Sequence, residues 1–294
     1  MATTKVTTPV TGFNSTNSGM YSTEEGLKLP SGISSNQPSG AAAEQGMIRN
    51  NTSKNTGGSA SAISHYNGTA WKYFAATASF PTSLLMNLDA SDLASYPGTG
   101  ATWFDLTSNG NNGALTSTSW NSSGYFDFNG STSYVTTGLT WPGSTKLSFS
   151  AWFRLDTLNV NQYITGDFNS AGVNAAFRFA IKITSGNILQ IGTNNGGTGT
   201  FLSFGSIAGY LNTWTNITVT VDGSAVIVYL QGVQFGGIGS GATILSAGSN
   251  PLNIGVYGPG SNKQNFNGFI SKARFYDVVV TQTEITTLHN EGPL

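Results

Sequence analysis

From residue 84 to the C-terminus, the sequence alternates apolar and polar residues in short runs separated by glycine, asparagine and serine. Side chains of a strand point alternately to two faces, so this period of two buries one face and leaves the other polar. Runs that recur every roughly 8–15 residues favour an antiparallel sandwich over βαβ units. The expected strands have the sequences LLMNLDA, YFDFNG, SYVTTG, LSFSAWFRL, FRFAIKI, ILQIGT, NITVTVDG, AVIVYLQG, LNIGV and FISKARFYD.

Two tight turns and one helix complete this region. Ser185-Gly186 and Asp222-Gly223-Ser224 each separate two alternating runs and therefore predict hairpins. Only the segment TQTEITTLHNEG is typical of a helix. Thr281 or Thr283 can cap its start, and Gly292-Pro293 ends it.

Composition agrees with a β-rich chain and argues against several function classes. Only 9% of the 294 residues are charged, compared with about 25% in ordinary domains, and 38 are glycine. The net charge of −1 gives no electrostatic reason to bind nucleic acid or an anionic membrane. Cysteine is absent, which excludes disulfides. A polar start and the lack of an apolar run of about 18 residues predict neither a signal peptide nor a membrane span, so we expect synthesis in a cytoplasm.

The first 83 residues divide into three predicted segments. Residues 1–28 are polar and lack a hydrophobic period, so we expect a disordered tail or an extended arm that becomes ordered on another protein. Residues 29–75 predict a small β-hairpin module, and residues 76–83 predict a linker of small residues. A module of this size cannot bury a sufficient core of its own, and without cysteine its natural support is oligomerisation.

Two motifs of the hairpin module resemble a short module of phage fibre and virion proteins. They are Gly46-Met47-Ile48-Arg49-Asn50-Asn51-Thr52 and Tyr66-Asn67-Gly68-Thr69-Ala70-Trp71, with Asn50 where the phage module normally has an aromatic residue. The resemblance implies an often trimeric stem that joins an anchor to a distal domain. We therefore expect a homotrimer whose arm binds other virion proteins. The expected oligomerisation residues are Met47, Ile48, Tyr66 and Trp71.

A set of motifs in residues 84–294 follows the order found in one large superfamily. They are Trp103-x-Asp105-Leu106, Phe126-Asp127-Phe128-Asn129-Gly130, Ser148-Phe149-Ser150-Ala151-Trp152-Phe153, Trp214-Thr215-Asn216-Ile217 and Phe266-Asn267-Gly268-Phe269-Ile270. Together they resemble the laminin-G-like, concanavalin A-like lectin/glucanase superfamily. The resemblance implies an all-β fold whose C-terminal antiparallel sandwich is a jelly-roll of the concanavalin A kind.

The chain lacks the residue pattern of the enzymes in this superfamily. Glycoside hydrolysis needs two carboxylates roughly 5–9 Å apart, and the glucanase relatives place theirs on one strand as Glu-x-Asp-x-Glu. No glutamate lies between Glu44 and Glu284, and the aspartates of this interval lie one to a segment. We interpret His65 and His289 as packing or surface residues rather than general bases. We therefore expect no enzyme, since a catalytic pair would have to be assembled from distant strands.

Two kinds of binding site are expected at the loops of the sandwich. Relatives hold calcium at one rim, and the resemblance implies candidate ligands at Asp167, Asn174 and Asn250. Asparagine brings no charge, so calcium, the one cofactor left open, would bind weakly. Sugars have apolar faces ringed by hydroxyls, which suits an aromatic ring beside amides. The candidate ligand-binding residues are Asn194, Asn195, Tyr257 and Asn262, although each is more typical of an ordinary turn.

The favoured hypothesis is a non-catalytic structural protein of a phage virion, either a fibre or a decoration protein. Its laminin-G-like head would bind host-surface glycans at the virion surface, after assembly in the host cytoplasm. A polysaccharide-degrading enzyme of the particle is one alternative, and it requires two close carboxylates in one cleft. A stand-alone bacterial carbohydrate-binding module is another, and it predicts a signal peptide or an attached catalytic domain.

Trp152 and Trp214 lie in alternating strands and are expected in the core.

Overall fold

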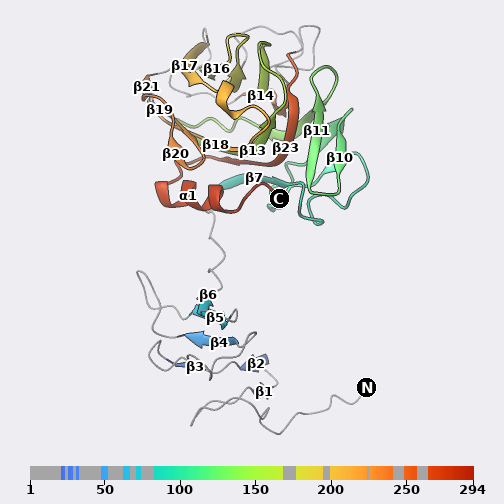
Figure 1. Cartoon of the computed structure of the whole chain (residues 1–294), viewed down its shortest axis with the longest axis vertical. Coiled ribbons are helices and arrows are strands. Elements are labelled where there is room, and N and C mark those ends of the chain that lie inside the picture. Colours follow the sequence, from blue (N-terminus) through green and yellow to red (C-terminus); the bar gives the residue numbers. More distant parts are fainter. Residues whose placement is uncertain are drawn as a thin grey trace. The chain divides into compact units, whose positions relative to one another are not determined.

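The structure is a computed structural model, shown in Figure 1. It describes residues 83–167, 177–194, 199–223, 225–240, 248–256 and 264–294, together with the backbone of short strands between residues 21 and 73. The chain divides into two compact units, Met1–Ser79 and Phe80–Leu294. Within the described residues, no helix has the length and apolar character needed to cross a membrane.

The first unit contains short paired strands. β1 (Tyr21–Thr23) and β2 (Gly26–Lys28) form an antiparallel pair inside the segment that was expected to be an extended arm. Pairing of this kind supplies backbone hydrogen bonds that an extended arm would lack. β3 (Ser31–Gly32) lies parallel to β4 (Ile48–Asn51), which continues antiparallel into β5 (Ala62–Tyr66) and β6 (Trp71–Tyr73). Three of the predicted oligomerisation residues, Ile48, Tyr66 and Trp71, belong to these strands, whereas Met47 lies outside the described residues.

The second unit begins with a nine-stranded antiparallel sheet. Its order over the described residues is β10-β11-β23-β13-β18-β19-β20, with β7 beside β23 and β21 beside β19. Its strands are β7 (Leu84–Asp89), β10 (Ser119–Asn121), β11 (Tyr125–Asn129), β13 (Lys146–Leu155), β18 (Trp214–Asp222), β19 (Ala225–Leu230), β20 (Val233–Gln234), β21 (Gly239–Ser240) and β23 (Asn267–Tyr276). The ten-residue strands β13 and β23 pair along most of their length at the centre.

The other sheet of this unit is eight-stranded and also antiparallel. Its order over the described residues is β17-β16-β15-β14-β22-β12-β9-β8. Its strands are β8 (Thr102–Trp103), β9 (Gly113–Thr116), β12 (Tyr134–Thr140), β14 (Gln162–Gly166), β15 (Phe179–Ile183), β16 (Ile188–Thr193), β17 (Thr200–Ser206) and β22 (Pro251–Ile254). A short 3-10 turn, Ala208–Tyr210, follows β17.

Aromatic side chains from both sheets fill the space between them. Phe149 of β13 contacts Phe179 of β15, with their ring centroids 6.1 Å apart, and Trp141 packs edge-on against Phe275 of β23 at 5.5 Å. All four are buried. Burying one such ring contributes about 2–3 kcal/mol, so the inward face of each strand drives the packing of the two sheets. The predicted antiparallel sandwich is confirmed.

The local pattern located most of these strands. Each of the ten predicted strands is present, and both predicted hairpins pair in register. The ten predicted strands do not include β9, β10, β14 or β17. In β17, aromatic residues occupy both faces and obscure the alternation. Strands of two residues, such as β8 and β20, carry no readable period.

The predicted C-terminal helix is α1 (Gln282–Asn290), and it covers part of the outer face of the nine-stranded sheet. Thr281 caps it: its side chain accepts from the backbone N–H of Glu284, whose carboxylate accepts from the backbone N–H of Thr281. This capping box satisfies two N–H groups that would otherwise lack partners. Trp152 is buried, as expected, but on the outer face of the sheet beneath α1, where its Nε1 donates to the Leu288 carbonyl at 3.2 Å.

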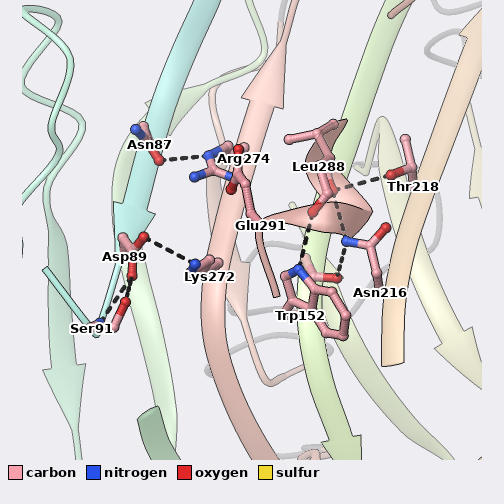
Figure 2. A network of polar contacts seen from close by, with 12 residues as sticks. Asn87, Asp89, Ser91, Trp152, Asn216, Thr218, Lys272, Arg274, Leu288 and Glu291 are labelled. Carbon is pink, nitrogen blue, oxygen red and sulfur yellow. Dashed lines mark hydrogen bonds and ion pairs between the residues drawn. The ribbon is translucent and has the colours of Figure 1, made fainter. Parts of the chain in front are cut away.

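Buried charges and amides attach this helix to the sheet, as Figure 2 shows. Arg274 of β23 donates to Asn87 of β7 at 2.9 Å and to Glu291, just after α1, at 2.6 Å. Lys272, two residues earlier on the same face, lies 3.6 Å from the Asp89 carboxylate. These pairs explain how two cations remain buried on a face that a small helix covers.

Candidate functional site

The outer face of the eight-stranded sheet carries a row of large and polar side chains. Tyr163 of β14 lies opposite Lys182 of β15, which lies opposite Gln190 of β16, which lies opposite Ser203 of β17. Phe201, two residues before Ser203, is on the same face of β17. The inward positions between them, including Ile164 and Ile191, belong to the core. Register therefore collects five chemically useful side chains from four strands on one face of the sheet; Tyr163 is buried, and the other four are partly or fully exposed.

Two aromatic rings flank the lysine of this row. The Lys182 ammonium lies 5.7 Å from the Tyr163 ring centroid and 5.5 Å from that of Phe201. A cation at this distance is attracted by the negative face of a ring. Partial burial lowers the pKa of Lys182 because desolvation disfavours its charged form. Among the described residues, no carboxylate pairs with this ammonium, so the row offers an uncompensated positive charge.

The apolar part of the surface is built around Phe201. This half-buried ring stacks on buried Phe177 at 5.5 Å and meets Tyr163 edge-on at 6.4 Å. Gly192 makes room for these rings, since a Cβ there would lie 2.7 Å from Phe201 and 2.9 Å from Phe177. Gln190 donates from Nε2 to the Ser203 hydroxyl at 3.0 Å, which leaves the amide oxygen of Gln190 available. An aromatic plane bordered by an amide, a hydroxyl and an ammonium can contact both an apolar face and several hydroxyls of a ligand.

Two of the four predicted ligand-binding residues, Asn194 and Asn195, directly follow β16 of this surface in the sequence. Asn194 follows β16 directly and is fully buried, and its backbone N–H donates to the Arg178 carbonyl at 3.2 Å. Asn195, Tyr257 and Asn262 lie outside the described residues. The contribution of these four residues to ligand binding stays a prediction.

The predicted metal residue Asp167 has a structural task at the end of β14. Its carboxylate accepts from the backbone N–H groups of Arg178, at 2.7 and 2.9 Å, and of Phe179, at 2.8 Å. Burial raises the pKa of Asp167 to about 6, and the hydrogen bonds from Phe179 and Arg178 only partly oppose this rise. Asn250 is half-buried and Asn174 lies outside the described residues.

The oxygen ligands that the described part of this rim offers fit calcium poorly. Calcium takes six to eight oxygen ligands, with carboxylates supplying the charge. The part of the rim that the structure describes offers one carboxylate, and backbone N–H groups already occupy both of its oxygens. Within the described residues, no group of three or more His, Cys, Asp or Glu side chains is arranged to hold a metal ion.

Comparison with known proteins identifies the sandwich. A family model of the concanavalin A-like lectin/glucanases superfamily matches residues 128–286, more than half of the chain. The chain belongs to this superfamily. A search of curated proteins finds no match to the sequence.

Solved structures share the concanavalin A-like fold at low sequence identity. The receptor-binding domain of botulinum neurotoxin C/D mosaic serotype aligns at 12% identity with a TM-score of 0.54, covering 71% of this chain and 51% of that domain. The receptor-binding domain of botulinum neurotoxin type G aligns at 15% identity with a TM-score of 0.52 and the same coverage. A Trypanosoma rangeli sialidase aligns at 16% identity with a TM-score of 0.52, covering 71% of this chain and 33% of the enzyme. The chain thus spans about half the length of the toxin domains and a third of the sialidase.

Sequence reasoning missed the surface row of this concanavalin A-like unit. Tyr163 lies on β14 and Phe201 on β17, two strands that the alternation of apolar and polar residues did not predict. The sequence signal for this strand is the pair of aromatic residues in the segment TFLSFGS of β17. Lys182 lies opposite Gln190 only because of the register between β15 and β16, which cannot be predicted from the local sequence.

Proposed function

We propose that this concanavalin A-like unit binds glycans through the outer face of its eight-stranded sheet and serves as the non-catalytic head of a phage virion protein. The observation that carries the glycan-binding proposal is the row that places Lys182 beside the half-buried ring of Phe201. A pyranose presents one apolar face that stacks on an aromatic ring, while its hydroxyls accept and donate hydrogen bonds. Gln190 and Ser203 supply those polar partners at the edge of the ring.

The charge of the proposed surface determines which sugars it prefers. The ammonium of Lys182 favours a sugar that carries a carboxylate over one that carries an amine. Solved structures of this fold are consistent with glycan recognition: one is a sialidase in complex with 2,3-difluorosialic acid, and one concerns entry of botulinum neurotoxin type C through interaction with two ganglioside molecules. Their low identity makes them support for the class of ligand only.

The non-catalytic part of the proposal rests on how the carboxylates are used. Asp105 accepts from three backbone N–H groups, those of Asn87, Thr107 and Asn111. Asp167 holds the start of β15 in the same way. A carboxylate committed to the backbone is a poor general acid or nucleophile, because the reaction would have to break the bonds that position it.

The virion part of the proposal rests on the first unit. The motifs that resemble the phage stem module coincide with the antiparallel strands β4, β5 and β6. Weak binding by each head would suffice on a particle, because many copies raise the effective concentration of sites. The proposed location is therefore the virion surface, with residues 1–28 attaching the chain to other virion proteins.

A glycan array probed with the full chain tests the binding surface. Phe201→Ala and Lys182→Met are expected to reduce the signal on the best-bound glycans about tenfold or more, since each removes one part of the proposed contact. Phe104→Ala and Lys146→Met are matched controls, because Phe104 is exposed and Lys146 forms an exposed ion pair elsewhere. Equal array signals from all four variants and the unchanged chain would place binding on another surface.

A further inference from the structure

The nine-stranded sheet carries a separate row of side chains on its own outer face. Asp127 of β11 lies opposite Phe269 of β23, which lies opposite Arg154 of β13, which lies opposite Trp214 of β18. Tyr125, two residues before Asp127, extends over the same surface. Trp214, expected in the core, is half-buried here on the outside of the sandwich.

The aromatic side chains of this row pack into one platform. The Tyr125 ring centroid is 4.7 Å from that of Phe269 and 5.6 Å from that of Trp214. The Arg154 guanidinium lies 4.0 Å above the Phe269 ring. Beside this stack, the backbone of β23 approaches that of β13 so closely that a Cβ at Gly268 would collide with the Arg154 carbonyl oxygen. Register and close approach thus hold the rings in fixed positions.

Helix α1 covers another part of this outer face. Over β13, β18 and β23, helix α1 covers Trp152, Asn216 and Arg274, and all three are buried. The platform lies beyond that covered area, and Tyr125, Phe269 and Trp214 each keep part of their surface in solvent.

Several polar groups of the platform have no partner in the described part of the chain. The structure shows no hydrogen bond there for the Tyr125 hydroxyl, the Trp214 Nε1 or the Asp127 carboxylate. Arg154, by contrast, binds Asp156 through two hydrogen bonds of 3.0 and 3.2 Å. Since Asp156 offsets Arg154, Asp127 leaves one uncompensated negative charge at the edge of the rings. Its pKa is raised by burial and by the charge of Asp156, and lowered by Arg154.

We infer that this platform is a second carbohydrate-binding site, and that it takes a neutral pyranose. Stacking on the Trp214 ring, which Tyr125 meets edge-on, would cover the apolar face of the sugar. The indole N–H donates to a ring hydroxyl, and the Asp127 carboxylate accepts from one or two others. An acidic sugar would meet the negative charge of Asp127 and would be repelled.

This site is independent of the glycan surface proposed above. It lies on the other sheet, and its charge has the opposite sign, so the two surfaces select different sugars. Failure of one leaves the other untouched, because Lys182 and Phe201 contribute nothing to the platform.

Titration calorimetry of the full chain with neutral oligosaccharides, chitotetraose and cellotetraose, tests the platform. The unchanged chain is expected to bind at least one of them with millimolar or better affinity, and not the corresponding uronic acid oligomers. Trp214→Ala and Asp127→Asn are each expected to weaken that binding about tenfold or more. Lys146→Met, Phe104→Ala and Asp222→Asn serve as controls that retain it, with folding checked by circular dichroism.

The results decide the matter in either direction. Asp127 is exposed, so Asp127→Asn keeps the test valid even where Trp214→Ala fails to fold. No heat of binding with either neutral oligosaccharide, or unchanged affinity in a folded platform variant, overturns the site. Release of new reducing ends would also overturn it as a binding site, because the sugar would then be cleaved rather than only bound.

Discussion

Individual carboxylates in this chain accept hydrogen bonds from backbone N–H groups and so fix the loops between strands. Asp167 is the clearest example. It ties the end of β14 to the start of β15 through the N–H groups of Arg178 and Phe179. Sequence alone suggested a calcium ligand at this position, because a carboxylate near a loop fits both tasks. What distinguishes them is the direction of the neighbouring N–H groups, which only the folded backbone determines.

The raised pKa of Asp167 predicts a pH dependence of stability. The folded pKa is about 6 and the ordinary value is 3.8, so between these values the folded state keeps a proton that the unfolded state has lost. The free energy of unfolding that Asp167 contributes therefore falls as pH rises from about 4 to 6, by roughly 3 kcal/mol at most. Urea unfolding at pH 4, 5, 6 and 7 should show this fall in the unchanged chain and its loss in Asp167→Asn. Parallel pH curves for the two proteins would contradict it, and Asp222→Asn provides an exposed-carboxylate control.

At the scale of elements, the strands were predictable wherever one face is apolar and the other polar. β13 and β19 alternate in this way and end at clear turn residues, so their sequences alone located them. β17 places Phe201 and Phe204 on opposite faces, and β14 is buried at all five of its positions, so neither shows an alternation of buried and exposed residues. The two proposed sugar surfaces were unpredictable for a related reason: each is a row of register partners, and register arises from pairing between distant segments.

One buried ion pair contributes to the attachment of α1. Glu291→Gln removes the carboxylate that Arg274 contacts at 2.6 Å, and the Arg274 side chain is only 6% exposed. We expect a loss of about 2–4 kcal/mol in the free energy of unfolding, because the buried guanidinium loses the carboxylate that it contacts. Asp222→Asn breaks the exposed pair with Lys146 and should cost about 0.5 kcal/mol or less in the same urea titration. Equal losses from both substitutions would mean that the pair does not hold the helix.

At the scale of the whole molecule, the prediction concerns assembly. Three strands of the first unit carry motifs that resemble a trimeric phage stem, and the unit has no cysteine to support it. Light scattering should therefore give about three times the 30.7 kDa mass of one chain. Trp71→Arg should shift this mass toward one chain, whereas Phe104→Arg, at an exposed position of the other unit, should leave it unchanged. A monomeric unchanged chain would contradict the stem and favour a stand-alone binding module.

The central claim is that the sandwich binds sugars without cleaving them. The most direct measurement is a calorimetric titration of the full chain with the best acidic glycan from the array, followed by an assay for reducing ends. We expect saturable binding, about tenfold weaker in Lys182→Met and unchanged in Lys146→Met, with no new reducing ends. No binding up to millimolar glycan, equal binding by Lys182→Met, or turnover of the glycan would contradict the account.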